Sequence, residues 1–122
     1  MYNPANQWSV VHTPAAATQA TITKAGVAGY RHVCDGIIAT IAAAGTAQTP
    51  INVVLRDGAT GVGAIIFTAQ LSAPANAAGI LAASGLGIPG TAGNAMTLEF
   101  TGAGVAASME AVTMIGFDLL SS

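Results

Sequence analysis

The stretch from Gly58 to Leu98 contains no charged side chain. The whole chain of 122 residues has three basic and five acidic residues, so 7% of it is charged, against the roughly 25% that is typical of soluble globular domains. A surface with so few charges is weakly protected from association with neighbouring molecules. We therefore expect the folded chain to be covered either by lipid or by other protein subunits.

The charge-free stretch is interrupted too often for a membrane-spanning helix. Such a helix needs about 20 consecutive, mostly apolar residues, whereas Gly61, Pro74, Gly79 and Pro89 break this segment into short pieces. We therefore expect no membrane partner. A weakly polar surface of alanine, glycine, serine and threonine that contacts protein predicts a structural component of an assembly.

The length and the charge balance limit the other classes of protein. A chain of 122 residues can bury one hydrophobic core, and no linker divides it, so we expect a single β-sandwich domain over residues 1–122, in which residues 1–14 can form an N-terminal arm. The formal net charge of −2 provides no basic surface for nucleic acid. Cys34 has no partner for an intramolecular disulfide, and the first residues do not resemble a secretory signal. Both features predict synthesis in a reducing cytoplasm.

Short β-branched segments separated by turn residues predict an all-β fold. Eight such segments in one domain indicate two packed sheets. The Gly-rich segment 83–90 is expected to be a long irregular connection. We expect strands at residues 7–12, 17–24, 30–43, 51–57, 62–71, 78–82, 95–101 and 107–119.

The clearest hairpin joins residues 51–57 to 62–71 and has Asp57-Gly58 at its turn, where positive φ angles are required. Its apolar side chains predict a shared core face on which Ile51, Val53 and Leu55 lie opposite Ile65, Phe67 and Leu71. In the segment 95–101, apolar residues alternate with Thr97, Glu99 and Thr101, which predicts one dry and one solvated face.

The last expected strand has apolar residues on both faces. One face carries Met109, Ala111, Ile115, Phe117 and Leu119, and the other carries Val112 and Met114 together with Glu110 and Asp118. Two explanations fit this pattern: a second subunit covers the outer side, or the strand is buried between two layers. Under the first explanation, Val112 and Met114 are candidate partner contacts.

Motifs that suggest chemistry have simpler structural explanations. The segment Gly85–Gly90 matches G-x-G-x-x-G, but the strand expected after it, in place of a helix, argues against a dinucleotide site. His32 and Cys34 share a strand face, yet no third residue is positioned to orient the histidine, so we expect a buried structural cysteine and a histidine near a sheet edge. Solvated strand faces explain Glu99 and Glu110. The sequence predicts no catalytic residue, no cofactor and no metal site.

Two aromatic residues near the N-terminus are candidate contacts. Tyr2 and Trp8 can anchor the N-terminal arm on its own core, or they can bind a partner subunit, because aromatic side chains dominate interface energetics. Tyr2, Trp8, Val112 and Met114 are therefore the candidate partner-binding residues.

Three segments, 29–37, 53–58 and 87–99, together resemble small virion proteins of tailed bacteriophages, with jelly-roll capsid cement (decoration) proteins as the nearest group. The resemblance implies a jelly-roll-like β-sandwich of about eight strands and a non-enzymatic role on the outer surface of the virion capsid. It also implies bridging of major capsid protein subunits, often as a homodimer or homotrimer. The alternative is a tail or fibre module that recognises a host receptor, although loops of glycine, alanine, serine and threonine are atypical of receptor binders.

Overall fold

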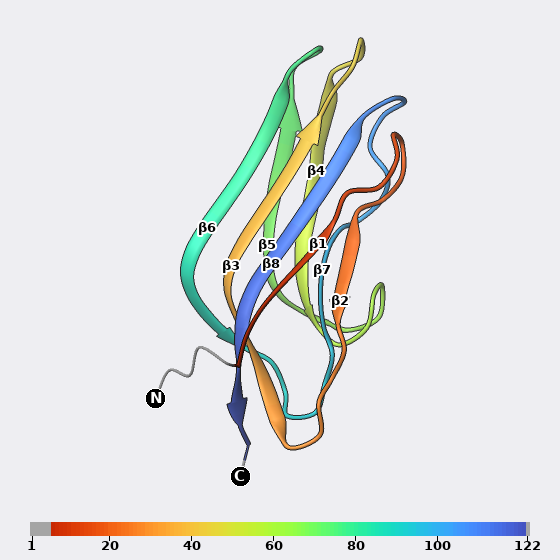
Figure 1. The fold of residues 1–122 in the computed structure, drawn as a ribbon. Coiled ribbons are helices and arrows are strands. Elements are labelled where there is room, and N and C mark those ends of the chain that lie inside the picture. The colour runs from red at the N-terminus through yellow and green to blue at the C-terminus, as the bar shows by residue number, and fades with distance from the viewer. Residues whose placement is uncertain (1–5, 122) are drawn as a thin grey trace.

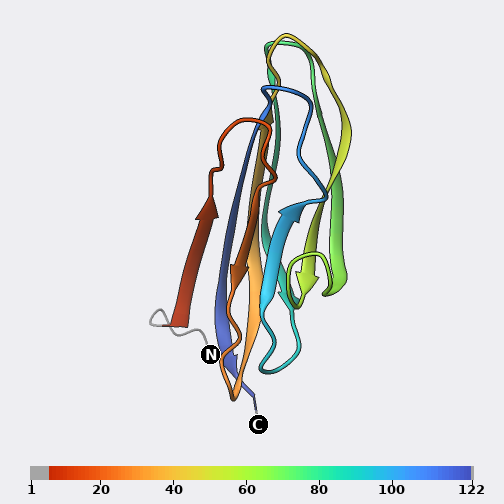
Figure 2. The same ribbon diagram turned by 90° about the vertical axis from the view of Figure 1, so that its right-hand side faces the viewer.

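The computed structural model describes residues 6–121, which form two four-stranded antiparallel sheets packed face to face (Figures 1 and 2). One sheet has the strand order β1-β8-β3-β6 and the other has the order β2-β7-β4-β5. The predicted all-β sandwich of eight strands is confirmed. Within the described residues no helix is long and apolar enough to cross a membrane. The strands are β1 (Gln7–His12), β2 (Thr21–Lys24), β3 (Tyr30–Ala42), β4 (Gln48–Asp57), β5 (Ala64–Ala73), β6 (Ala78–Pro89), β7 (Met96–Phe100) and β8 (Met109–Leu120).

The strand order follows a nested scheme. β1 pairs with β8, β2 with β7, β3 with β6 and β4 with β5, and β8 also pairs with β3 while β7 also pairs with β4. The early half of the chain therefore lies against the late half throughout, as in an eight-stranded jelly roll. The start of β1 and the end of β8 lie at the same end of the sandwich (Figure 1).

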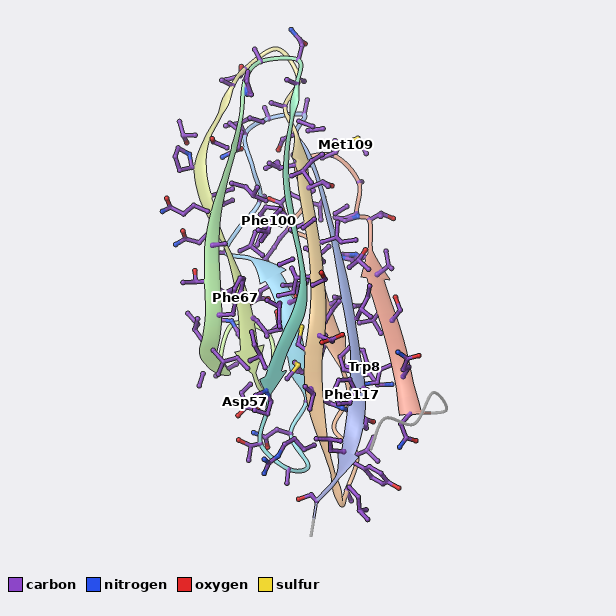
Figure 3. All side chains as sticks on the ribbon, turned by 90° about the vertical axis from the view of Figure 1, so that its left-hand side faces the viewer. Trp8, Asp57, Phe67, Phe100, Met109 and Phe117 are labelled. Carbon is purple, nitrogen blue, oxygen red and sulfur yellow. The ribbon has the colours of Figure 1, made fainter. Side chains whose placement is uncertain are left out.

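The hydrophobic core fills the space between the two sheets. Its largest side chains are fully buried, and Figure 3 shows Phe100 between the layers. Cys34 is one of the buried core residues, as the sequence predicts. Trp8 and Phe67 pack against the core from the borders of the sandwich. The most buried large apolar residues are Ile37, Ile41, Val53, Leu55, Met96, Leu98, Phe100, Val112 and Met114.

The β4–β5 hairpin has the predicted partners at two of three positions. Ile51 pairs with Leu71 and Leu55 with Phe67. Ile65 was expected on the core face but pairs with Arg56 and is 53% exposed, because a bulge at Leu55/Arg56 shifts the register by one residue. The connection is also longer than a two-residue turn, and in it Gly58 and Gly61 adopt positive φ angles of 133° and 70°.

The segment 83–90 is not an irregular connection, since β6 continues to Pro89. Cys34 of β3 pairs with Ile88 and Gly36 pairs with Ser84, so three residues of β6 lie opposite one residue of β3. Gly85 and Gly87 have φ angles of +67° and +58°, which glycine adopts without a steric penalty. Leu86, between them, packs against the core. The glycines therefore form a bulge within a strand, and the nucleotide-binding motif lies on a strand without a following helix.

The expectation of a solvated face on β7 is wrong. All five residues of this strand are buried, including Thr97 and Glu99. Residues 58–63, which connect β4 and β5, fold back over this side of the strand: Gly61 donates a hydrogen bond to Glu99, and Thr97 donates one to the carbonyl oxygen of Gly58. A short strand under a loop is therefore covered on both sides.

Candidate functional site

Trp8 belongs to a strand of the sandwich. Residues 7–12 form β1 and pair with β8, so this part of the expected N-terminal arm is an edge strand. The indole Nε1–H donates a 2.7 Å hydrogen bond to Asp118 Oδ1, and the ring packs edge-on against His32 with 5.5 Å between the centroids. The Lys24 ammonium lies 5.8 Å from the centre of the Trp8 ring. These contacts support the alternative in which Trp8 anchors the segment on its own domain.

His32 is buried in the centre of a sheet and not near an edge, because β3 lies between β8 and β6. A third residue does orient the ring: Nδ1 lies 2.5 Å from Asp118 Oδ1, and Nε2 lies 2.7 Å from the carbonyl oxygen of Ala25. Burial raises the pKa of the Cys34 thiol to about 11, which keeps this side chain protonated at neutral pH. The Trp8–Asp118–His32 chain of contacts thus ties β1, β8 and β3 together.

Val112 and Met114 do not belong to the surface of the folded chain. The even-numbered residues from Glu110 to Gly116 are buried on the core side of β8, and the side chains of Val112 and Met114 have no exposed area. The grouping of β8 residues by face is as expected, but the face offered to a partner is the opposite one, which carries Met109, Ile115 and Leu119. Tyr2, the remaining candidate, lies outside the described residues.

The exposed side of the β1-β8-β3-β6 sheet carries a continuous surface without charge. One row across the four strands contains Val11, Thr113, Ile38 and Ala82, which are paired in that order. A second row contains Ala111, Thr40 and Ile80. Beside the first row lie Ser9, Ile115, Gly36 and Ser84, and beside the second lie Met109, Ala42 and Ala78. We call these four rows the apolar face.

Large aliphatic side chains project from the apolar face. Ile80 is 68% exposed, Val11 and Met109 are each 53% exposed, and Ile38 and Ile115 are about two-fifths exposed. A hollow lies among these side chains at Gly36, next to the bulge in the pairing of β3 with β6. Its lining includes Ile38, Ala82, Ser84 and Ile115. Scattered exposed aliphatic residues are common on proteins, but a contiguous uncharged group on one sheet indicates an interaction surface.

Most of the acidic residues accept hydrogen bonds from other parts of the chain. Asp57 accepts hydrogen bonds from the Thr91 backbone N–H and hydroxyl, and Glu110 accepts one from the Ala20 backbone N–H. Asp118 accepts a hydrogen bond from the Trp8 indole, and Glu99 accepts one from Arg56. Four of the five acidic side chains, Asp57, Glu99, Glu110 and Asp118, are therefore held by intramolecular hydrogen bonds. Glu99 and Glu110 are also buried, so the surface carries less charge than the composition suggests.

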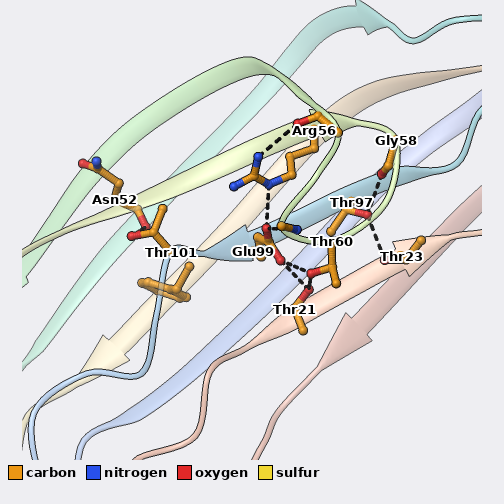
Figure 4. A network of polar contacts seen from close by, with 12 residues as sticks. Thr21, Thr23, Asn52, Arg56, Gly58, Thr60, Thr97, Glu99 and Thr101 are labelled. Carbon is orange, nitrogen blue, oxygen red and sulfur yellow. Dashed lines mark hydrogen bonds and ion pairs between the residues drawn. The ribbon is translucent and has the colours of Figure 1, made fainter.

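The carboxylate of Glu99 lies at the centre of a polar network on the outside of β7 (Figure 4). Arg56 donates from Nε to Glu99 Oε2 over 2.6 Å, and the Thr21 hydroxyl, the Thr60 hydroxyl and the Gly61 backbone N–H complete the set of donors. Burial alone would raise the pKa of Glu99, but these hydrogen bonds outweigh it and hold the pKa below the ordinary value of a glutamate. The network fastens the β4–β5 connection onto the sheet.

Glu110 has a different environment, on the inner side of β8. One oxygen accepts a 2.8 Å hydrogen bond from the Ala20 N–H, whereas Oε2 is buried without a hydrogen-bond partner in the structure. Burial raises the pKa of Glu110, and the backbone donors of Ala20 and Gly104 only partly oppose this effect. The expectation that solvated strand faces explain Glu99 and Glu110 is therefore wrong for both residues. Among the residues that the structure describes, no group of three or more histidine, cysteine, aspartate or glutamate side chains is arranged to hold a metal ion.

The fold and these surfaces define a charge-poor jelly-roll domain with one apolar sheet face open to contact. No protein-family model matches the sequence, and no curated protein sequence matches it either. Among solved structures, the coat protein of Tobacco streak virus is similar, with 10% sequence identity, a TM-score of 0.41, and coverage of 100% of this chain and 92% of that chain. The strand orders of the two sheets define the jelly roll.

Proposed function

We propose that this protein is a non-enzymatic structural protein of a virion, which binds the outside of a bacteriophage head and bridges subunits of the major capsid protein. The observation that carries the proposal is the scarcity of free charge over the whole jelly-roll domain, including one apolar sheet face that is open to a neighbouring subunit. Jelly rolls are common in viral capsid proteins, although they also occur in lectins and cupins, so the fold alone does not decide the function.

The physical basis of such a role is mass action. A protein that binds the assembled shell and not the free subunits stabilises the shell by its binding free energy. Because a head repeats each site many times, modest contacts are sufficient for full occupancy when each copy touches several subunits. A surface of small, uncharged side chains suits contact with protein on several sides, since it leaves few charges to be desolvated.

Location in the particle is the direct test. Immunogold labelling of virions, with antibodies against this protein, is expected to decorate the heads. Virions that lack the protein are expected to release their genome at a lower temperature than complete virions. Label confined to the tail would instead support the alternative, a tail or fibre module that recognises a host receptor. Absence of the protein from purified virions would refute both functions.

Tyr2 remains the proposed contact of the N-terminal segment with the capsid. We expect Tyr2→Ala to reduce the number of copies bound per head without affecting the thermal stability of the free protein, because β1 begins only at Gln7. Asn3→Ala is the matched control, since it removes a neighbouring side chain that is not aromatic. Equal occupancy of the Tyr2→Ala and unaltered proteins would remove this residue from the interface.

A further inference from the structure

Within residues 6–121, no segment covers the apolar face of the β1-β8-β3-β6 sheet. Two of its rows run across all four strands and two run across three, so it is a broad surface and not a single exposed side chain. With strands about 4.8 Å apart and about 3.4 Å per residue along a strand, the rows from Met109 to Ile115 span roughly 19 by 24 Å, or about 450 Å² before side-chain relief is counted. Specific interfaces at the small end of the range bury about 600 Å² per partner. The flat projection is smaller than this value and leaves out the relief of side chains such as Ile80, which is 68% exposed, so the face suits a contact at the weak end of that range.

We infer that a second copy of this chain covers the apolar face, so that two sandwiches pack sheet against sheet about a two-fold axis. The inference deepens the proposed function, and it rests on that function only for the place where the dimer acts, the outside of a virion head. It assigns the apolar face to self-association and leaves the β2-β7-β4-β5 sheet and the loops for contacts with the capsid.

Charge is the first argument for a second copy. The four rows contain no ionisable side chain, so two copies placed face to face oppose no like charges and bury no unpaired charge. A partner with an ordinary surface, of which about a quarter is charged residues, would have to desolvate charges against a face that offers them no counterpart. An equally uncharged surface avoids this cost, and the chain itself carries one.

Shape is the second argument. A two-fold contact requires one surface to hold both the projections and the hollows that receive them. The apolar face has both: the side chains of Ile80 and Val11 project into solvent, and the hollow at Gly36 lies between Ile38 and Ile115. Small residues such as Ala82 and Ser84 around the hollow allow a second sheet to approach at about 10 Å, the usual separation of packed sheets.

Sedimentation equilibrium of the purified protein tests the inference directly. We expect a reversible monomer–dimer equilibrium in the micromolar range, as suits an interface of this size. Ile38→Lys combined with Ile80→Lys is expected to weaken dimerisation by more than about a hundredfold, because each substitution places a charge in the buried contact. Val62→Lys is the matched control, since Val62 is 81% exposed in the β4–β5 connection and lies outside the apolar face.

A second variant keeps the surface uncharged. A Cβ atom on Gly36 would meet no heavy atom closer than 3.5 Å within its own chain, so Gly36→Ala should fold normally while it partly fills the hollow. We expect it to weaken dimerisation by about tenfold, a change that corresponds to one poorly fitted methyl group. Circular dichroism and thermal unfolding at dilutions where the protein is monomeric verify that each variant is folded.

Nuclear magnetic resonance locates the contact. In a dilution series, the amide signals that shift with concentration are expected to lie on β8, β3 and β6. Shifts confined to the other sheet, a monomer at millimolar concentration, or equal weakening by Val62→Lys would each overturn the inference. A monomer in solution that nevertheless binds virion heads would assign the apolar face to the capsid protein, so that the proposed function stands and self-association fails. A dimer that is absent from virions would give the reverse result.

Discussion

Arg56 should be essential for stability because it is the only cationic side chain that contacts the buried Glu99 carboxylate within the residues described. The side chain of Glu99 is 2% exposed and that of Arg56 is 15% exposed. Removing one partner of a buried ion pair costs about 3–5 kcal/mol, and the partial exposure of Arg56 places the expected loss for Arg56→Met at about 3 kcal/mol. For a domain of this length, that loss corresponds to a decrease in Tm of about 10 °C.

Urea unfolding, followed by tryptophan fluorescence and circular dichroism, measures the loss. Arg31→Met is the matched control, because it makes the same substitution at an exposed arginine, and it should change the free energy of unfolding by less than about 0.5 kcal/mol. The double substitution Arg56→Met with Glu99→Leu should recover most of the stability, since no charge is then left buried. Without the carboxylate, the Thr21 and Thr60 hydroxyls, whose oxygens lie 2.9 Å apart, can bond to each other, and water can reach the exposed Gly61 N–H.

The pH dependence provides a separate measurement of the same network. Because the pKa of Glu99 in the folded protein lies below its value in the unfolded chain, the stability from this group is present above the ordinary glutamate pKa of 4.5. It is lost as the pH falls from that value through the folded pKa. Arg56→Met should reduce this loss. A cost of less than about 1 kcal/mol for Arg56→Met, as for an exposed ion pair, would refute the argument that the pair is buried and essential.

Three further predictions concern single positions. Glu110 has a raised pKa in the folded protein, so the free energy of unfolding should fall as the pH rises from 4.5, the pKa of Glu110 in the unfolded chain, through its pKa in the folded protein. Urea titrations at a series of pH values measure this slope, and Glu110→Gln should remove it. Gly116→Ala should destabilise the fold by about 3 kcal/mol and alter the Trp8 fluorescence, because its Cβ would lie 2.3 Å from the Val33 carbonyl oxygen and 2.5 Å from the indole ring. The Cys34 thiol should react with an aromatic disulfide reagent only in denaturant, since it is fully buried and has a pKa of about 11; rapid reaction of the native protein would contradict this burial.

The sequence predicted the number of strands and the fold class well, because period-two patterns and turn residues are local signals. It predicted less well where glycines occur inside a strand. Gly85 and Gly87 have the composition of a loop, yet they form a bulge, and only the pairing with β3 distinguishes the two. The same limit applies to Ile65, which a bulge moved from the core face to the surface.

The partner contacts on β8 were wrong for a related reason. Alternation shows which residues share a face, but it does not show which face is turned toward the second sheet when both are apolar. Val112 and Met114 lie on the inner face despite their neighbours Glu110 and Asp118. Those two acids are accommodated by backbone N–H groups and by Trp8 and His32, which come from segments about 80 to 110 residues away in the sequence. No local pattern reports such partners.

The place of β8 between β1 and β3 also limits when the molecule can form during its synthesis. Until residue 120 has been made, β1 has no neighbour in its sheet and β3 lacks one of its two partners, so a nascent chain cannot close the sandwich in stages. A ribosome-bound fragment would leave the core side of one sheet open to water and to chaperones. The apolar face, which lies on β1, β8, β3 and β6, is therefore complete only after β8 has been added to the sheet.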